Sequence, residues 1–173
     1  LEETFDVPLE GSVLPETYYF SYGDTRSEIV QRMVRAMDNN LNRLWQERAS
    51  GLPFKGPGDA LILASIVEKE TGVKVERARI AGVFINRLNK GMRLQSDPTV
   101  VYGLSEGEGP LGRPLSRADL KKKTPYNTYT INGLPPGPIC NPGLTAIQAV
   151  MNPQHTDDLY FVADGKGGHV FSK

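Results

Sequence analysis

The sequence predicts an α+β fold, a single domain of several helices with short strands and a C-terminal β-hairpin around a groove. Three observations support this class. Apolar residues recur at spacings of three and four in three segments, which is the pattern of amphipathic helices. Residues 159–163 and 169–171 are β-rich and flank the glycine-rich stretch 164–168, which is the pattern of a hairpin. Residues 124–138 are rich in Pro, Gly, Tyr and Asn and show neither the periodicity of a helix nor that of a strand.

Composition restricts the functional classes. The 173 residues suffice for one domain with a real core, and 39% hydrophobic and 23% charged residues are typical of a soluble globular protein. Twenty basic and twenty acidic residues cancel, so no net positive field attracts nucleic acid, and we expect no such partner. The longest aliphatic run, 61–67, is too short to cross a bilayer, and no secretion signal begins the chain. Because the first residue is leucine, we expect an excised fragment.

The N-terminal part is predicted to be extended and then helical. Residues 7–9 and 17–20 are apolar runs bounded by Gly and Pro, and we predict strands or extended segments there. Thr25 begins a helix that runs to about residue 47, because Glu28 completes a capping box. The buried face of this helix is expected to contain Ile29, Met33, Met37, Leu41, Leu44 and Trp45.

The helix expected at 59–71 contains one carboxylate in an unusual position. Asp59 follows a Gly-Pro-Gly stretch and is predicted to be the N-cap. The apolar stripe of this helix is Ile62, Leu63, Ile66 and Val67. Glu70 lies three residues after Val67 and four after Ile66, in the middle of that stripe. Glu68 lies on the opposite side, above Ala64 and Ser65.

Two interpretations of Glu70 remain open at this point. In one, the helix frays at its end and Glu70 reaches water or pairs with Arg77 or Arg79. In the other, Glu70 is a catalytic acid, because apolar neighbours and the negative end of the helix dipole both raise a carboxyl pKa. A raised pKa is what a general acid needs at neutral pH.

Shorter elements are predicted further along the chain. A helix is expected from about Val75 to Asn89, with Gly91 ending it in a left-handed conformation and Asn86 either a surface amide or a polar group beside its apolar stripe. Residues 92–95 are predicted to be a short strand, and Asp97 is predicted to cap a short helix that starts at Pro98. Residues 105–114 form a glycine-rich loop, Ser116 caps another short helix, and a last helix is expected from 141 to 151.

The remaining candidate chemistry is limited. Aromatic rings beside amide and hydroxyl groups at 125–129 suit sugar recognition, since ring faces stack on sugars and polar groups bind hydroxyls. Cys140 is the only cysteine, so it forms no internal disulfide, and we interpret it as structural because no motif ties a histidine to it. Two histidines and one cysteine disfavour a zinc site. The 164–168 turn lacks the spacing of a phosphate loop.

Six motifs resemble one known family. The stretches 64–71, 83–88, 94–100, 126–129, 133–143 and 160–168 are similar, in the same order, to the endolytic murein transglycosylases, the YceG-like family. The resemblance covers nearly the whole chain. It implies that residues 1–173 are the catalytic domain of a longer protein, without its N-terminal membrane anchor, its LysM-like segment and its extreme C-terminus.

The resemblance also implies an activity and a location. Family members cleave the β-1,4 bond between N-acetylmuramic acid and N-acetylglucosamine inside peptidoglycan strands, and the product carries a 1,6-anhydro end. This releases or terminates new glycan strands. The implied location is the bacterial inner membrane, crossed once, with the catalytic domain outside the cytoplasm. The implied partners are glycan strands and peptidoglycan synthases, with no metal or cofactor and with membrane contact only through the missing anchor.

The family's catalytic glutamate corresponds to Glu70, the residue that helical spacing also selects. The resemblance places substrate binding at Gln95, Asp97, Tyr126, Asn127, Thr128, Tyr129 and Asn141. We therefore expect a groove beside Glu70 with walls formed by 95–99 and 126–141. Two other functions remain open: a hydrolase of the same bond, with Asp97 or Glu68 activating water, and a glycan-binding scaffold in which Glu70 is structural.

Overall fold

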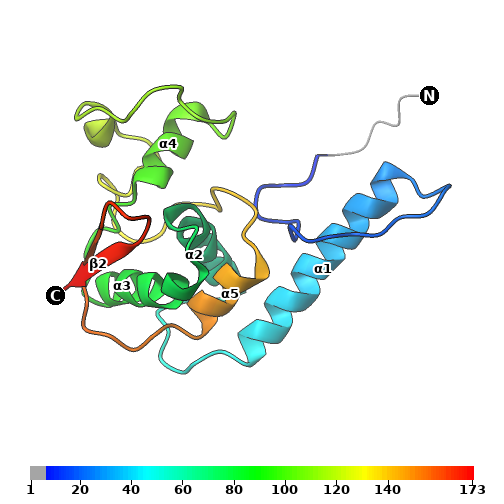
Figure 1. The fold of residues 1–173 in the computed structure, drawn as a ribbon, viewed down its shortest axis with the longest axis horizontal. Helices are drawn as coiled ribbons and strands as arrows, with labels where there is room; N and C mark the ends of the chain where they lie inside the picture. The colour runs from blue at the N-terminus through cyan, green and yellow to red at the C-terminus, as the bar shows by residue number, and fades with distance from the viewer. Residues whose placement is uncertain (1–6) are drawn as a thin grey trace.

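The computed structural model describes residues 7–173, and this range contains five α-helices, two 3₁₀ helices and a two-stranded antiparallel sheet (Figure 1). This arrangement confirms the predicted α+β class. No helix in the range is long and apolar enough to span a membrane. The elements are α1 (Arg26–Gln46), α2 (Pro57–Glu70), η1 (Lys74–Glu76), α3 (Arg77–Asn89), α4 (Asp97–Ser105), η2 (Asp119–Lys121), α5 (Leu144–Met151), β1 (Tyr160–Ala163) and β2 (His169–Ser172).

Helix α2 is the centre of the fold. It packs against α1, α3, α4 and α5, and Figure 1 shows α2, α3 and α5 grouped together while the long α1 extends along one side. Leu63, Ile66 and Val67 are fully buried, as the periodicity predicts. Burial of each such side chain contributes roughly 1.5–3 kcal/mol. Glu70 is the last residue of this central helix.

The opposite side of α2 is also buried, which the sequence pattern did not predict. Ala64 and Ser65 are completely enclosed because the 139–140 segment lies against them. The Ser65 hydroxyl accepts a hydrogen bond from the Ile139 N–H at 3.0 Å, and the Cys140 thiol donates to the Ser65 carbonyl at 3.3 Å. Glu68 therefore points into a protein contact and not simply away from the core.

The predicted N-cap of α2 is wrong by three residues. The helix begins at Pro57, and its N-cap is Gly56. Proline is favoured in the first helical turn because its fixed φ suits the helix and its missing N–H has no partner to lose there. Asp59 does not cap the helix. Its carboxylate accepts a hydrogen bond from the Lys55 N–H at 2.8 Å and closes the preceding turn.

Helix α1 confirms the predicted capping box. The Thr25 hydroxyl accepts from the Glu28 N–H at 3.2 Å, and the Glu28 carboxylate accepts from the Thr25 N–H at 2.8 Å. Of the six residues expected on the buried face, only Met37 and Leu44 are buried; the other four are half-buried. Of the two alternatives predicted for 7–9 and 17–20, the strands do not form in the described chain, and both segments lie outside any helix or strand. Pro8 and Pro15 lack a backbone donor, and the Leu14 N–H binds the Met33 carbonyl of α1 instead.

Three further boundaries differ from the predictions. Residues 74–76 are a 3₁₀ turn that precedes α3, and α5 begins at Leu144 after an irregular 141–143 segment. The Ser116–Asp119 pair makes the reciprocal bonds of a cap, yet only the 3₁₀ turn η2 follows. The left-handed Gly91 (φ 66°) after α3 is confirmed.

The expected strand at 92–95 is also wrong. Gln95 has a left-handed backbone (φ 52°), and its N–H binds the Thr128 carbonyl at 3.2 Å. A strand cannot continue through that conformation. Helix α4 follows directly, with Asp97 as its first residue and Ser96 as its N-cap position. The turn directs the 95–97 side chains toward the end of α2, a placement described below.

The C-terminal hairpin confirms the prediction. Strand β1 pairs with β2 in the register Tyr160–Ser172 to Ala163–His169. In the connecting turn, the Asp164 carboxylate accepts the N–H groups of Lys166 and Gly168. The Phe161 ring meets the Phe84 ring of α3 edge to face, with 5.6 Å between centroids. This contact docks the hairpin on α3 beside the end of α2.

One glycine of α3 is expected to be indispensable for packing. A Cβ added at Gly82 would lie 2.5 Å from the Gln154 carbonyl oxygen. Gly82→Ala should therefore destabilise the protein by about 1–3 kcal/mol through overpacking, although alanine is about 1 kcal/mol better than glycine in an unconstrained helix. Urea unfolding measures the change. Gly58→Ala in α2 is the matched control. A Cβ added there would meet no atom outside its chain neighbours and its own helix backbone within 4 Å, so this variant should be neutral or stabilising. Equal stability of Gly82→Ala and the parent would contradict the packing argument.

Candidate active site

Glu70 lines a pocket of about 300 Å³ at the C-terminal end of α2. Three parts of the chain enclose it: the 94–97 turn with Tyr129, Arg87 of α3, and the hairpin. Its lining residues are Glu70, Arg87, Leu94, Gln95, Asp97, Tyr129, Phe161, Val162, Ala163 and His169. The pocket is thus formed by segments that are far apart in the sequence.

The environment of Glu70 favours its protonated form. Burial raises the pKa of its carboxyl group, a hydrogen bond from Ser96 lowers it, and the nearby negative charge of Asp97 raises it again, with a net upward shift. Its position at the helix C-terminus acts in the same direction. Glu70 has no ion-pair partner among residues 7–173. The two arginines considered for it, Arg77 and Arg79, pair with Glu68 and Asp158 instead.

Ser96 is the group that contacts Glu70 directly. Its hydroxyl donates to Glu70 Oε1 at 2.5 Å. The Ser96 N–H donates to Thr128 Oγ1 at 2.9 Å, and the hydroxyls of Thr128 and Thr99 are 2.8 Å apart. These buried bonds fix the position of the Ser96 hydroxyl. No sequence pattern indicated Ser96, although it lies between Gln95 and Asp97, two residues expected in the site.

Asp97 and Tyr129 form the second polar group of the pocket. The Tyr129 hydroxyl donates to Asp97 Oδ1 at 2.6 Å. Burial and then the Asp97 hydrogen bond raise the pKa of Tyr129, so its hydroxyl stays protonated at neutral pH. Gln95 lies beside them in its left-handed conformation, a strained arrangement that is common in functional sites. Gln95, Asp97 and Tyr129 are therefore brought together with Glu70, as expected.

The other four residues selected for substrate binding do not line this pocket. Asn127 and Thr128 are completely buried, and the Asn127 amide donates to the carbonyls of Leu120 and Lys122. They support the wall from behind. Tyr126 packs on Tyr102, with 4.7 Å between ring centroids. Asn141 accepts a hydrogen bond from the Val13 N–H at 3.2 Å.

The hairpin provides the wall that the sequence did not predict. His169 lines the pocket, and its Nδ1 lies 2.8 Å from Glu76 Oε2 while its N–H donates to Glu76 Oε1 at 3.0 Å. Glu76 thereby orients the ring, and hydrogen bonding to His169 lowers the pKa of Glu76. The alternation of His169 and Phe171 along β2 placed both on one face, but nothing in the pattern indicated which element that face would meet.

Arg87 joins the two walls. Its Nε donates to the Leu159 carbonyl at the base of the hairpin, and its Nη1 donates to the Leu94 carbonyl, both at 2.6 Å. The guanidinium is buried in the protein and also borders the pocket. Its positive charge disfavours a cationic ligand and favours a ligand oxygen that carries partial negative charge. Within the described chain, no three His, Cys, Asp or Glu side chains are arranged to hold a metal ion.

Removal of the Ser96 hydroxyl should shift the pH dependence of any reaction that uses protonated Glu70. The hydrogen bond from Ser96 lowers the Glu70 pKa, so Ser96→Ala should raise it and move the alkaline limb of a kcat/KM profile to higher pH. The measurement is kcat/KM of that reaction across pH. Ser172→Ala, at an exposed serine that does not line the pocket, is the control. A limb that moves to lower pH in Ser96→Ala would contradict this assignment.

A half-buried carboxyl group with a raised pKa, facing a pocket that contains amide, hydroxyl and aromatic groups, defines an acid–base site suited to a polar substrate. The chain belongs to the YceG-like family, whose model matches residues 2–173. It is 40% identical over 167 residues to an endolytic murein transglycosylase of Bacillus subtilis, and 38% identical over 169 residues to one of Streptococcus pneumoniae. These alignments cover 96% and 94% of this chain.

The relatives are much longer. The chain spans 45% of the Bacillus subtilis protein and 29% of the Streptococcus pneumoniae protein. The fold is similar to the crystal structure of a YceG-like protein from Listeria monocytogenes, with a TM-score of 0.80 and 41% identity. That match covers 99% of this chain and 54% of the other.

Proposed function

We propose that the chain is the catalytic domain of an endolytic peptidoglycan lytic transglycosylase. The observation that carries this proposal is Glu70, a half-buried carboxyl group with a raised pKa that faces a pocket of sugar-binding character. The names of the two relatives support the reaction class. The bond cleaved is the β-1,4 linkage from N-acetylmuramic acid to N-acetylglucosamine.

One carboxyl group is sufficient for this reaction. Protonated Glu70 gives its proton to the glycosidic oxygen, and the bond from C1 to that oxygen breaks. The C6 hydroxyl of the same muramic ring attacks C1, and the Glu70 carboxylate accepts its proton. Glu70 ends protonated, and the products are a free 4-hydroxyl and a 1,6-anhydro ring. An intramolecular nucleophile has a high effective concentration, so no second group is needed to activate water.

The neighbouring groups have supporting roles. The Ser96 hydroxyl holds one oxygen of Glu70, which directs the other toward the pocket. The Asp97 carboxylate, held by Tyr129, places negative charge near the ring carbon that becomes positive in the transition state. Gln95 and Tyr129 are positioned to bind sugar hydroxyl or acetamido groups.

Hydrolysis of the same bond is the second candidate, and one observation favours it. Asp97 is a second carboxylate in the same pocket, and inverting or retaining glycosidases use such a pair. Its engagement by the Tyr129 hydroxyl reduces its availability as a base, which favours the transglycosylase.

Product analysis tests the proposal. Purified peptidoglycan glycan strands are incubated with the protein, and the fragments are analysed by mass spectrometry. We expect 1,6-anhydro ends, one water lighter than reducing ends, and early products of mixed length that indicate internal cutting. Reducing ends would establish the hydrolase, and binding without cleavage by an intact, folded chain would favour a scaffold.

The cellular setting is part of the proposal. We place residues 1–173 outside the cytoplasm of a bacterium, attached to the inner membrane through another part of the protein, where new strands emerge and are released. Peptidoglycan synthases are then the expected partners. Cell fractionation with protease accessibility and crosslinking of the full-length protein test these points separately.

A further inference from the structure

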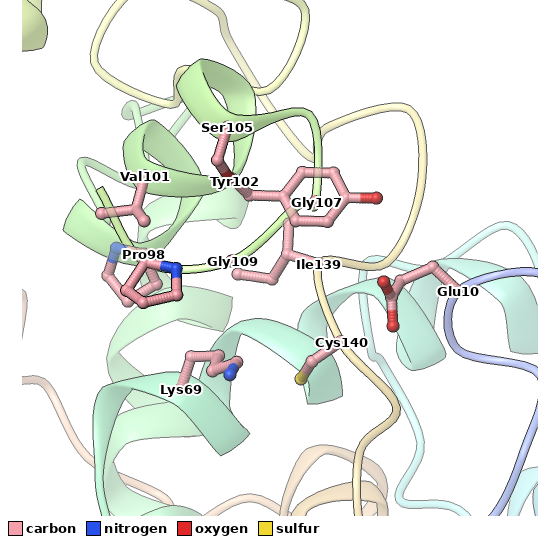
Figure 2. Close-up of a pocket in the computed structure, with 11 residues that line it drawn as sticks. Glu10, Lys69, Pro98, Val101, Tyr102, Ser105, Gly107, Gly109, Ile139 and Cys140 are labelled. Carbon is pink, nitrogen blue, oxygen red and sulfur yellow. The ribbon is translucent and has the colours of Figure 1, made fainter. Parts of the chain in front are cut away.

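A second pocket, of about 440 Å³, lies at the same end of α2. Its lining includes Lys69 and Pro98, which directly precede Glu70 and follow Asp97 in the chain, so consecutive residues of α2 and of α4 face the two pockets. The rest of the lining comes from α4, the 107–110 loop, the 139–140 segment and Glu10 of the N-terminal segment (Figure 2).

The pocket is mostly apolar, with two charged groups at its edge. Val101, Tyr102 and Ile139 form the wall. Cys140 also contributes a neutral surface, because burial raises the pKa of its thiol to about 12. Figure 2 shows Lys69 and Glu10 on different sides of the pocket. Both side chains are exposed, and neither makes an ion pair or side-chain hydrogen bond with any other residue in the range 7–173.

The position of Glu10 follows from packing of the N-terminal segment. Gly11 has a left-handed backbone (φ 83°), and a Cβ there would lie 2.5 Å from Pro138 Cγ. Glycine at this position lets the segment lie directly against residues 138–140 of the chain. The carboxylate of Glu10 is consequently part of a surface built by distant segments, opposite an ammonium group from α2.

This lining suits a short peptide better than a sugar. A sugar ring carries several hydroxyl groups around its rim, and this mostly apolar wall offers few polar partners for them. A small peptide with methyl side chains, a carboxylate and an amine matches the apolar wall, Lys69 and Glu10. A volume of about 440 Å³ lies within the usual range for a small-ligand site.

The substrate of the proposed function carries such a peptide. Each muramic acid bears a lactyl ether from which a stem of alanine, glutamate and a diamino acid extends. The lactyl group is on the same ring as the reacting C1, so the stem begins beside Glu70 and can reach the second pocket.

We propose that the second pocket binds the stem peptide of the muramic acid that is cleaved. Lys69 pairs with a stem carboxylate, Glu10 pairs with the free amine of the diamino acid, and the alanine methyl groups contact Val101, Tyr102 and Ile139. This inference rests on the proposed function and makes the enzyme selective for strands that still carry uncrosslinked stems.

Calorimetric titration with glycan strands tests the proposal, using Glu70→Gln as the background to prevent cleavage. Stem-bearing strands should bind about tenfold more tightly than peptide-free strands of the same length. Adding Lys69→Met should remove most of this preference and leave the affinity for peptide-free strands unchanged. Lys90→Met, at an exposed lysine outside both pockets, should change neither affinity. Val101→Trp, which fills the pocket, should remove the preference as well.

A chemically modified ligand separates the role of Glu10. Acetylation of the diamino-acid amine should weaken binding to the Glu70→Gln protein, and Glu10→Gln should bind acetylated and free-amine strands equally. Absence of a preference for stem-bearing strands, or equal losses for both kinds of strand in Lys69→Met, would overturn the stem-peptide site while leaving the proposed function intact. Failure of even peptide-free strands to bind would overturn both.

Discussion

Replacement of Glu70 with glutamine is expected to reduce glycan cleavage at least about 100-fold, the lower end of what a positioned general acid contributes. Glutamine keeps the shape of the side chain, and its carbonyl can still accept the Ser96 hydrogen bond, but it has no proton of suitable acidity to give to the glycosidic oxygen. The measurement is the yield of 1,6-anhydro ends. Glu108→Gln, at an exposed glutamate of the 106–111 loop, should retain full activity.

The same substitution should leave the protein at least as stable as the parent at pH 7. Burial raises the folded-state pKa of Glu70 above its unfolded value, which is about 4.3. The folded state therefore binds the proton more tightly, and this stabilisation is fully present below the unfolded pKa. It is lost as pH rises through the raised folded pKa, at a cost of about 1.4 kcal/mol per unit of difference between the two pKa values.

Glutamine does not ionise, so the variant avoids this cost. Thermal unfolding should show the variant equal to or above the parent at pH 7, with the difference shrinking toward pH 4. A variant clearly less stable than the parent at pH 7 would mean that Glu70 is ionised and held in a favourable contact, and the acid assignment would fail.

Glu68 should show the opposite behaviour. Its Oε1 accepts from Arg77 Nη2 at 2.6 Å, and its Oε2 accepts from the Gly143 N–H at 3.0 Å. The Arg77 guanidinium is buried, with 8% of its side chain exposed. Glu68→Ala leaves that charge without its partner, which costs about 3 kcal/mol for a buried pair. Urea unfolding measures the loss.

An exposed ion pair in the same protein is the matched control. Arg43 in the last turn of α1 and Glu47 at its C-cap are four residues apart, with 3.1 Å between Arg43 Nη1 and Glu47 Oε2 and about half of each side chain exposed. Glu47→Ala should cost no more than about 0.5 kcal/mol, because water and salt screen an exposed pair. Equal effects at Glu68 and Glu47 would show that the Arg77 contact contributes little.

Glu68 should also be dispensable for the chemical step. It does not line the Glu70 pocket, so the more conservative Glu68→Gln should keep turnover within about tenfold of the parent, under ~1.4 kcal/mol of barrier. A loss of activity as complete as that of Glu70→Gln, in a variant that is still folded, would mean that the catalytic carboxylate is wrongly chosen or that both act together.

The sequence by itself determined most helices, the hairpin and the position of Glu70. These depend on interactions between residues three or four apart, such as the Thr25–Glu28 capping box and the spacing of Ile66, Val67 and Glu70 on α2. The turn at 164–168 is equally local, since Asp164 binds the N–H groups of its own loop. Local patterns of this kind can be recognised from the order of the residues alone.

Only the tertiary structure decided which groups surround Glu70. Ser96 binds it across 26 residues of chain, and His169 reaches its Glu76 partner across 93. The left-handed Gln95 exists because the Thr128 carbonyl holds its N–H, which no neighbour in sequence can do. Asn127 and Thr128 look like ligands in the sequence but are enclosed by packing. Burial and long-range hydrogen bonds depend on how distant segments of the chain pack together. For this reason the full lining of the pocket could not be predicted from the sequence motifs.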